Sequence, residues 1–102
     1  MAENPLATIG KIDPKLSEHL RETDALVFAE GALPAKYKLL IALAFDAAHG
    51  AADGVRSLAG RALRQGATRE EIAEAIRVAY HLSGVGCVYT ASAALKELFG
   101  AE

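Results

Sequence analysis

Apolar residues recur along this chain at intervals of three and four positions, which is the spacing of amphipathic helices. No stretch alternates apolar and polar residues in the manner of a half-buried strand. The pattern therefore predicts an all-α subunit with five helices. These are expected to cover approximately residues 14–30, 34–49, 51–65, 68–82 and 87–99.

The clearest boundary separates the third and fourth expected helices. Gly66 suits the left-handed backbone conformation that ends a helix. Thr68 and Glu71 have the spacing of a capping box, in which each side chain bonds to the other residue's backbone N–H. Asp13–Pro14 and Pro34 carry the corresponding start signals for the first two helices. Further breaks are expected at Gly31, Gly50 and Ser83–Gly86.

The helical periodicity also predicts which residues face the core. The second helix is apolar nearly all round, as is typical of a helix buried on more than one side. We therefore expect the second, third and fourth helices to form the centre of the subunit. The expected inward residues are Leu16, Leu20, Leu26, Val27, Val55, Leu58, Ala59, Ala62, Ile72, Ala75, Ile76, Ala79, Val88, Ala91, Leu95 and Leu98.

Some apolar residues lie outside these stripes. Val78, Tyr80 and Leu82 add apolar surface to other faces of the fourth helix, and we expect them to contact a neighbouring subunit. A chain of 102 residues buries only about 60–65% of its unfolded surface, so it is marginally stable alone. Both observations predict a homo-oligomer.

Composition narrows the class of protein further. The net charge is −2 and no basic stripe occurs, so a nucleic-acid partner is not expected. No apolar run approaches the roughly 18 residues of a membrane helix. A single Cys excludes an internal disulfide, and Met1–Pro5 lacks the features of a signal peptide, so we predict a cytoplasmic protein. Residues 1–12 are expected to form a loose arm before one helical domain, residues 13–102.

A specific order of short motifs runs from Leu33 to Leu95. It comprises Leu33–Lys38, Ile41–Ala44, Gly66–Thr68 with Glu71–Ala75, and Ser83–Gly84 with Tyr89 and Ala91. In this order and spacing the motifs resemble the carboxymuconolactone decarboxylase family, which includes alkylhydroperoxidase D. The resemblance implies an all-α fold, subunits that assemble as trimers or hexamers, and peroxidase or carboxy-lyase activity without a cofactor.

The residues that perform this chemistry in the family are replaced here. The peroxidase branch carries a Cys-x-x-Cys pair, a His four residues beyond the second Cys, and a Glu on the preceding helix. One thiolate attacks the peroxide and the other resolves the sulfenic acid, while Glu and His move protons. Counting back from Gly66 places Ala51 and Gly54 at the Cys positions, Leu58 at the His position and Leu39 at the Glu position. The decarboxylase branch lacks the Cys pair but uses the same Glu and His. Because this chain has Leu at both of those positions, the resemblance predicts the loss of the decarboxylase residues as well as the peroxidase residues.

Other residues offer candidate chemistry, although none is assigned as catalytic. Asp46, His49 and Asp53 would share one face of a continuous helix, where they could hold a metal or tune a general base. Alternatively, His49 ends the second helix and pairs with an exposed Asp. His81 could activate Cys87 as a nucleophile. Alternatively, Cys87 is a small apolar residue buried in the core. His81 would then interact with the dipole at its helix end or contact another subunit. No metal is predicted.

Two functions follow as hypotheses. In the first, the chain is a family-like protein that lacks peroxidase activity and has a binding or assembly role, with a small-molecule ligand in an inter-helix cleft. In the second, it is an enzyme of the same family that uses relocated residues. That enzyme would be a one-Cys peroxidase, or a decarboxylase or hydrolase of a small lactone-type acid.

Overall fold

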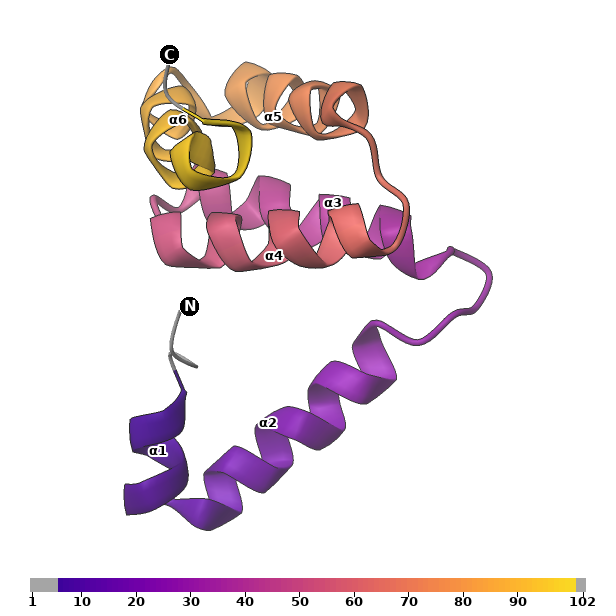
Figure 1. Ribbon diagram of the computed structural model, residues 1–102, viewed down its shortest axis with the longest axis vertical. Helices are drawn as coiled ribbons and strands as arrows, with labels where there is room; N and C mark the ends of the chain where they lie inside the picture. The colour runs from indigo at the N-terminus through magenta and orange to yellow at the C-terminus, as the bar shows by residue number, and fades with distance from the viewer. Residues whose placement is uncertain (1–5, 101–102) are drawn as a thin grey trace.

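The computed structural model describes residues 6–100, and these form six α-helices and no strand. The helices are α1 (Ala7–Ile12), α2 (Pro14–Val27), α3 (Ala35–Ala48), α4 (Ala52–Arg64), α5 (Arg69–Ser83) and α6 (Gly86–Phe99). The all-α prediction is confirmed, and five of the six helices lie close to their predicted ranges. Figure 1 shows them as a bundle of four helices, α3 to α6, with a helical arm, α1 and α2, that extends from it.

The additional helix corrects the prediction of five. α1 lies within the segment that was expected to be a loose arm, residues 1–12, of which residues 1–5 lie outside the described residues. Its backbone bonds are local, since the N–H of Gly10 donates to the carbonyl of Leu6 at 3.1 Å and that of Asp13 donates to Ile9 at 2.8 Å. None of its residues is buried, and no side chain caps its N-terminus. A helix this short leaves no apolar period in the sequence by which to recognise it.

The bundle has two layers. α3 and α4 pack side by side, and α5 and α6 cover one side of that pair, as Figure 1 shows. Leu43, Val55 and Ile72 are the largest fully buried side chains at the centre. The predicted centre of second, third and fourth helices therefore corresponds to α3, α4 and α5, with α6 closing the core. Alanines fill much of the remaining interior and allow close helix contacts, namely Ala47, Ala59, Ala62, Ala91 and Ala94.

The arm departs from the prediction. All four large apolar residues of α2 expected to face inward are exposed, and α2 has no buried residue. These residues are Leu16, Leu20, Leu26 and Val27. The helix also ends at Val27 rather than at residue 30. Periodicity shows that a helix has an apolar face, but the connection between α2 and α3 decides whether the same subunit covers it. Val88 and Leu98 of α6 were also expected inward and are likewise more than one third exposed.

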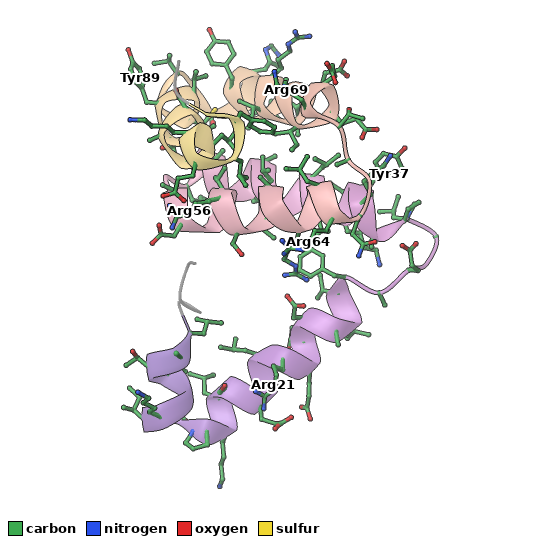
Figure 2. The ribbon with its side chains drawn as sticks, in the orientation of Figure 1. Arg21, Tyr37, Arg56, Arg64, Arg69 and Tyr89 are labelled. Carbon is green, nitrogen blue, oxygen red and sulfur yellow. The ribbon has the colours of Figure 1, made fainter. Side chains whose placement is uncertain are left out.

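Polar contacts attach the arm to the bundle near the C-terminal end of α2. The guanidinium of Arg61 on α4 donates two hydrogen bonds to the carboxylate of Asp24, both 3.0 Å long. The same guanidinium lies 4.8 Å from the centre of the Phe28 ring. Lys38 Nζ donates to the carbonyl of Ala29 at 2.7 Å. Figure 2 shows Arg64 at this junction and Arg21 farther out along α2.

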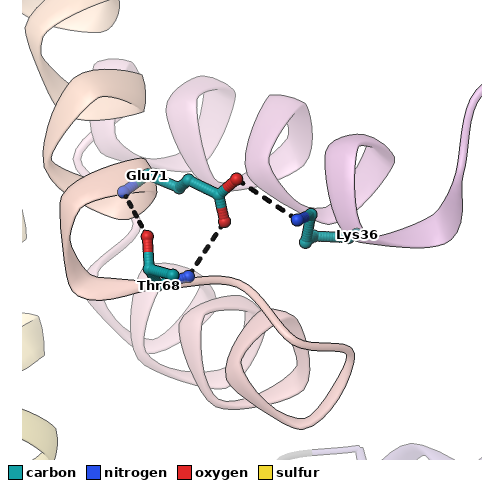
Figure 3. Close-up of polar contacts among 3 residues, drawn as sticks. All are labelled: Lys36, Thr68 and Glu71. Atoms are coloured by element: carbon teal, nitrogen blue, oxygen red, sulfur yellow. Dashed lines mark hydrogen bonds and ion pairs between the residues drawn. The ribbon is translucent and has the colours of Figure 1, made fainter.

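The predicted capping box is present at the start of α5 (Figure 3). Thr68 Oγ1 accepts from the Glu71 N–H at 3.0 Å, and Glu71 Oε1 accepts from the Thr68 N–H at 2.9 Å. Lys36 Nζ on α3 lies 3.2 Å from Glu71 Oε2. The Thr68 N–H, and after it Lys36, hold the pKa of Glu71 below its usual value. Gly66 has φ of 94°, the left-handed conformation predicted for it.

Candidate functional site

An open cleft of about 540 Å³ lies where the arm meets the α3–α4 side of the bundle. Its walls combine apolar and charged side chains from both parts of the subunit. The bundle supplies Ala42, Phe45, Asp46, Asp53, Gly54, Ser57, Leu58 and Arg61, and the arm side supplies Leu6, Asp24 and Phe28. The volume falls in the range of about 300–1,000 Å³ that is typical of small-molecule sites.

The floor of the cleft contains a close contact between two helices. Asp46 on α3 directs its carboxylate onto the backbone of Gly54 on α4, and a Cβ atom at position 54 would collide with Asp46 Oδ2. Only glycine leaves room for the carboxylate in this rotamer. The two residues lie on different helices, so neither the spacing nor the periodicity of the sequence reveals this contact.

The charges around the cleft are mostly paired. Arg61 binds Asp24 across the junction, and Asp53 forms a salt bridge of 2.8 Å with Arg56 on the same helix. Within residues 6–100, no salt bridge engages Asp46. Asp46 is therefore the acidic group of the cleft that has no cationic side chain bound to it.

Comparison with protein families identifies the scaffold. A model of the carboxymuconolactone decarboxylase family matches residues 14–97. The chain belongs to the carboxymuconolactone decarboxylase family. Neither the curated proteins nor the solved structures contain a match to it. The family match includes α2, so this arm helix is part of the family domain, whereas α1 precedes the matched region.

Counting along the sequence assigns four residues to the motif positions of the family, and the structure brings only two of them to the cleft. Gly54 and Leu58, at the positions of the second Cys and the His, line the cleft. Leu39, at the Glu position, is buried in the core, with 2% of its surface exposed. It lines a smaller cavity beside Arg61 and Gln65 instead. Ala51 immediately precedes α4 and is exposed. Two of the four positions that the sequence count assigns to the family motif therefore line the cleft.

The candidate cluster of Asp46, His49 and Asp53 does not share one helix. α3 ends at Ala48, and Gly50 turns the chain with φ of 77°. Asp46 and Asp53 both line the cleft, from α3 and α4 respectively. His49 is the residue that ends α3, and its ring lies 6.3 Å from that of Phe45. Among the described residues, no group of three His, Cys, Asp or Glu side chains is arranged to hold a metal ion.

His81 and Cys87 lie outside the cleft. Cys87, on the first turn of α6, is 3% exposed and belongs to the hydrophobic core. His81 lies in the last turn of α5 and is exposed. A buried thiol is not the accessible nucleophile that peroxide reduction requires. Over residues 6–100, the helices are too short or too polar to cross a membrane.

Proposed function

We propose that this family member has lost the family's redox and acid/base residues and has a non-peroxidase binding or assembly role. The observation that carries the proposal is the composition of the cleft. Gly54 and Leu58 line it at two motif positions, and no thiol or imidazole is among its lining residues. Peroxide reduction in the family needs two thiols in one site, whereas this chain has a single Cys, which is buried.

The cleft supports a binding role for a small amphiphilic molecule. Phe28, Phe45 and Leu58 provide apolar walls that would hold an apolar body. The Asp46 carboxylate, which has no cationic partner among residues 6–100, would accept hydrogen bonds from an amine or another donor on that molecule. We therefore expect amines with an apolar body to bind more tightly than carboxylic acids of the same size.

A peroxidase assay tests the catalytic half of the proposal. We expect no reduction of hydrogen peroxide or alkyl hydroperoxides above background when a dithiol donor is supplied. Wild-type protein and the Cys87→Ser variant should behave alike. Robust peroxide reduction that survives Cys87→Ser would refute the proposal, because it would require a redox site other than the only thiol.

A thermal-shift screen tests the binding half, since a ligand that binds the native state raises the melting temperature. Ser57 is exposed and lines the cleft, so Ser57→Trp should fill the cleft and abolish the shift. Ser92 on α6 is also exposed but lies elsewhere, so Ser92→Trp is the matched control and should keep the shift. A shift retained in Ser57→Trp would place the ligand outside the cleft.

One observation favours the alternative, an enzyme that uses relocated residues. Asp46 directs its carboxylate onto Gly54, the position of the second family Cys, and would act there as a general base on a small lactone-type acid. The decarboxylase or hydrolase version predicts that Asp46→Asn abolishes turnover while Asp53→Asn preserves it. Absence of turnover with wild-type protein on a panel of small lactone acids would reject it. The one-Cys peroxidase version requires rapid alkylation of Cys87 at neutral pH.

A further inference from the structure

A second, smaller cavity adjoins the cleft at the junction of arm and bundle. Its volume is about 170 Å³, which is far more than one water molecule needs. It shares only two lining residues with the cleft, Phe28 and Arg61. We call it the junction cavity. Its remaining lining residues come from α3 and from the C-terminal end of α4, namely Ala35, Leu39, Arg64 and Gln65.

The junction cavity has more positive than negative charge. Arg61 and Arg64 are three positions apart, which places both guanidiniums on one face of α4. Asp24 neutralises Arg61 through two hydrogen bonds. Arg64, which Figure 2 shows at the junction, has no ion pair or side-chain hydrogen bond within residues 6–100. Glu30, the one acidic residue between α2 and α3, forms no salt bridge in that range either, so the charge of Arg64 is uncompensated.

The end of α4 does not occupy the arginine side chains. Basic residues in a last turn commonly donate to the final carbonyls of their own helix. Here the carbonyls of residues 61 to 63 already accept hydrogen bonds of 2.9 to 3.1 Å from the backbone N–H groups of residues 65 to 67. The donors of Arg64 are therefore available to a ligand.

The number and direction of these donors indicate the kind of ligand. A guanidinium carries five N–H donors, and Arg61 uses one on each of its two terminal nitrogens for Asp24. Its remaining N–H groups, those of Arg64 and the side-chain amide of Gln65 surround the cavity. Donors on three side chains suit a tetrahedral anion with four oxygens, whereas the two oxygens of a carboxylate are matched by a single guanidinium.

We propose that the junction cavity binds phosphate, either as the free ion or as the phosphate group of a small molecule. The anion bridges the guanidiniums of Arg61 and Arg64 while Asp24 stays bound to Arg61. It relieves the repulsion between two like charges one turn apart. The Phe28 ring, 4.8 Å from the Arg61 guanidinium, holds that group at the cavity wall. This site goes beyond the proposed function, because the Asp46 carboxylate of the cleft suits an amine and not an anion.

The bound phosphate would also strengthen the attachment of the arm. The walls of the junction cavity come from three segments, with Phe28 just after α2, Leu39 on α3 and Arg64 on α4. Arg61 links these walls to Asp24 on the arm. An anion that fixes Arg61 in place thus holds α2 more firmly on the bundle.

A titration with inorganic phosphate, followed by ¹H–¹⁵N NMR at constant ionic strength, tests the site. We expect saturable shifts of the Gln65 side-chain amide and of the Arg64 Nε–H. Arg64→Gln should weaken binding at least about tenfold, because it removes the guanidinium that has no other anion. Arg77→Gln removes the same charge from an exposed position on α5 and should leave binding unchanged. Circular dichroism confirms that both variants keep their helices.

Three further ligands identify the source and the selectivity. Tighter binding of phenyl phosphate than of inorganic phosphate would assign the cavity to phosphorylated molecules, and equal binding would assign it to the free ion. Acetate and chloride should bind at least about tenfold more weakly than phosphate. Acetate that binds as tightly as phosphate would overturn the proposal. Equal weakening in Arg64→Gln and Arg77→Gln would do so too, since it would show diffuse attraction to surface charge.

Limited proteolysis tests the effect on the arm. Phosphate should slow cleavage between residues 28 and 34 several-fold in the wild-type protein and leave the rate unchanged in Arg64→Gln. Saturable phosphate binding without this protection would overturn the link between the site and the arm. Arg64→Gln should also keep the amine-induced thermal shift expected for the cleft, so a failure of this site is distinguishable from a failure of the proposed function.

Discussion

The bundle and the arm are made of the same kind of helix but differ in what covers them. α5 begins with a Thr68 side chain that accepts from a backbone N–H at 3.0 Å, and α2 begins with an Asp13 side chain that does so at the same distance. Both helices carry an apolar stripe. Yet the stripe of α5 is partly buried in the core, whereas α2 buries no residue. The same local capping signal therefore occurs at the start of a helix whether or not a core covers that helix.

Burial makes the energetic difference between the two regions. Leu43 of α3 is fully buried, and the transfer of such a side chain from water contributes about 1.5–3 kcal/mol. Leu26 of α2 is 78% exposed and gains little from folding of its own subunit. Burial in the bundle thus supplies most of the free energy of unfolding of the isolated subunit. The arm contributes little to it and leaves its apolar side chains exposed.

The largest expected effect is a core truncation in the bundle. Leu43→Ala should lower the free energy of unfolding by about 3 kcal/mol, because it leaves a cavity among fully packed helices. Leu26→Ala should change it by less than about 0.5 kcal/mol. Urea unfolding of both variants at one fixed protein concentration measures the difference. Equal losses would contradict the contrast between bundle and arm.

Removal of a helix cap should have a smaller effect that also depends on the region. Thr68→Ala should destabilise the bundle by about 1 kcal/mol, since the backbone N–H of Glu71 loses the side-chain oxygen that accepts its hydrogen bond. Asp13→Ala should loosen the start of α2 but leave the main unfolding transition unchanged. Thermal unfolding gives the first result, and amide exchange at Leu16, whose N–H binds Asp13, gives the second. A shared loss of stability would mean that arm and bundle unfold together.

The junction between the regions is expected to contribute less than about 1 kcal/mol, because the Arg61–Asp24 pair is partly exposed. Arg61→Gln should instead free the arm, and limited proteolysis should cut faster between residues 28 and 34. Arg56→Gln serves as the control, because it removes the ion pairs of Arg56 with Asp53 on α4 and with Glu97 on α6. Unchanged cleavage in Arg61→Gln would show that other contacts hold the arm.

The smallest expected effect is a pH dependence within the bundle. The pKa of Glu71 is lowered in the folded protein, chiefly by the hydrogen bond from the Thr68 N–H. The ionised carboxylate therefore stabilises the fold at pH values above 4.5, the ordinary pKa of this group. This contribution is lost as the pH falls below 4.5 through the lowered pKa. Glu71→Gln should show a shallower loss of melting temperature over that interval. Glu70→Gln is the neighbouring control, and an equal change in both variants would contradict the role of Glu71.

Part of the candidate site was predictable because it depends on sequence order. The motifs from Leu33 to Leu95 indicated the family that the match over residues 14–97 establishes. Counting from Gly66 assigned two family motif positions to Gly54 and Leu58, and both residues line the cleft. The contact of Asp46 with Gly54 could not be predicted, because it joins two helices across a turn at Gly50. That turn also removed the continuous face on which the Asp46, His49 and Asp53 cluster depended.

The sequence by itself determined where the longer helices begin and, except for α2, approximately where they end, since capping and helical periodicity depend on residues within about four positions of one another. It also determined that one thiol is available and that the family's thiol pair is absent. The tertiary structure decided which apolar stripes are covered. It buries Leu39 and Cys87 in the core, and it places α2 outside the core. Burial depends on contacts between distant segments, and those are set by the packing of the whole subunit.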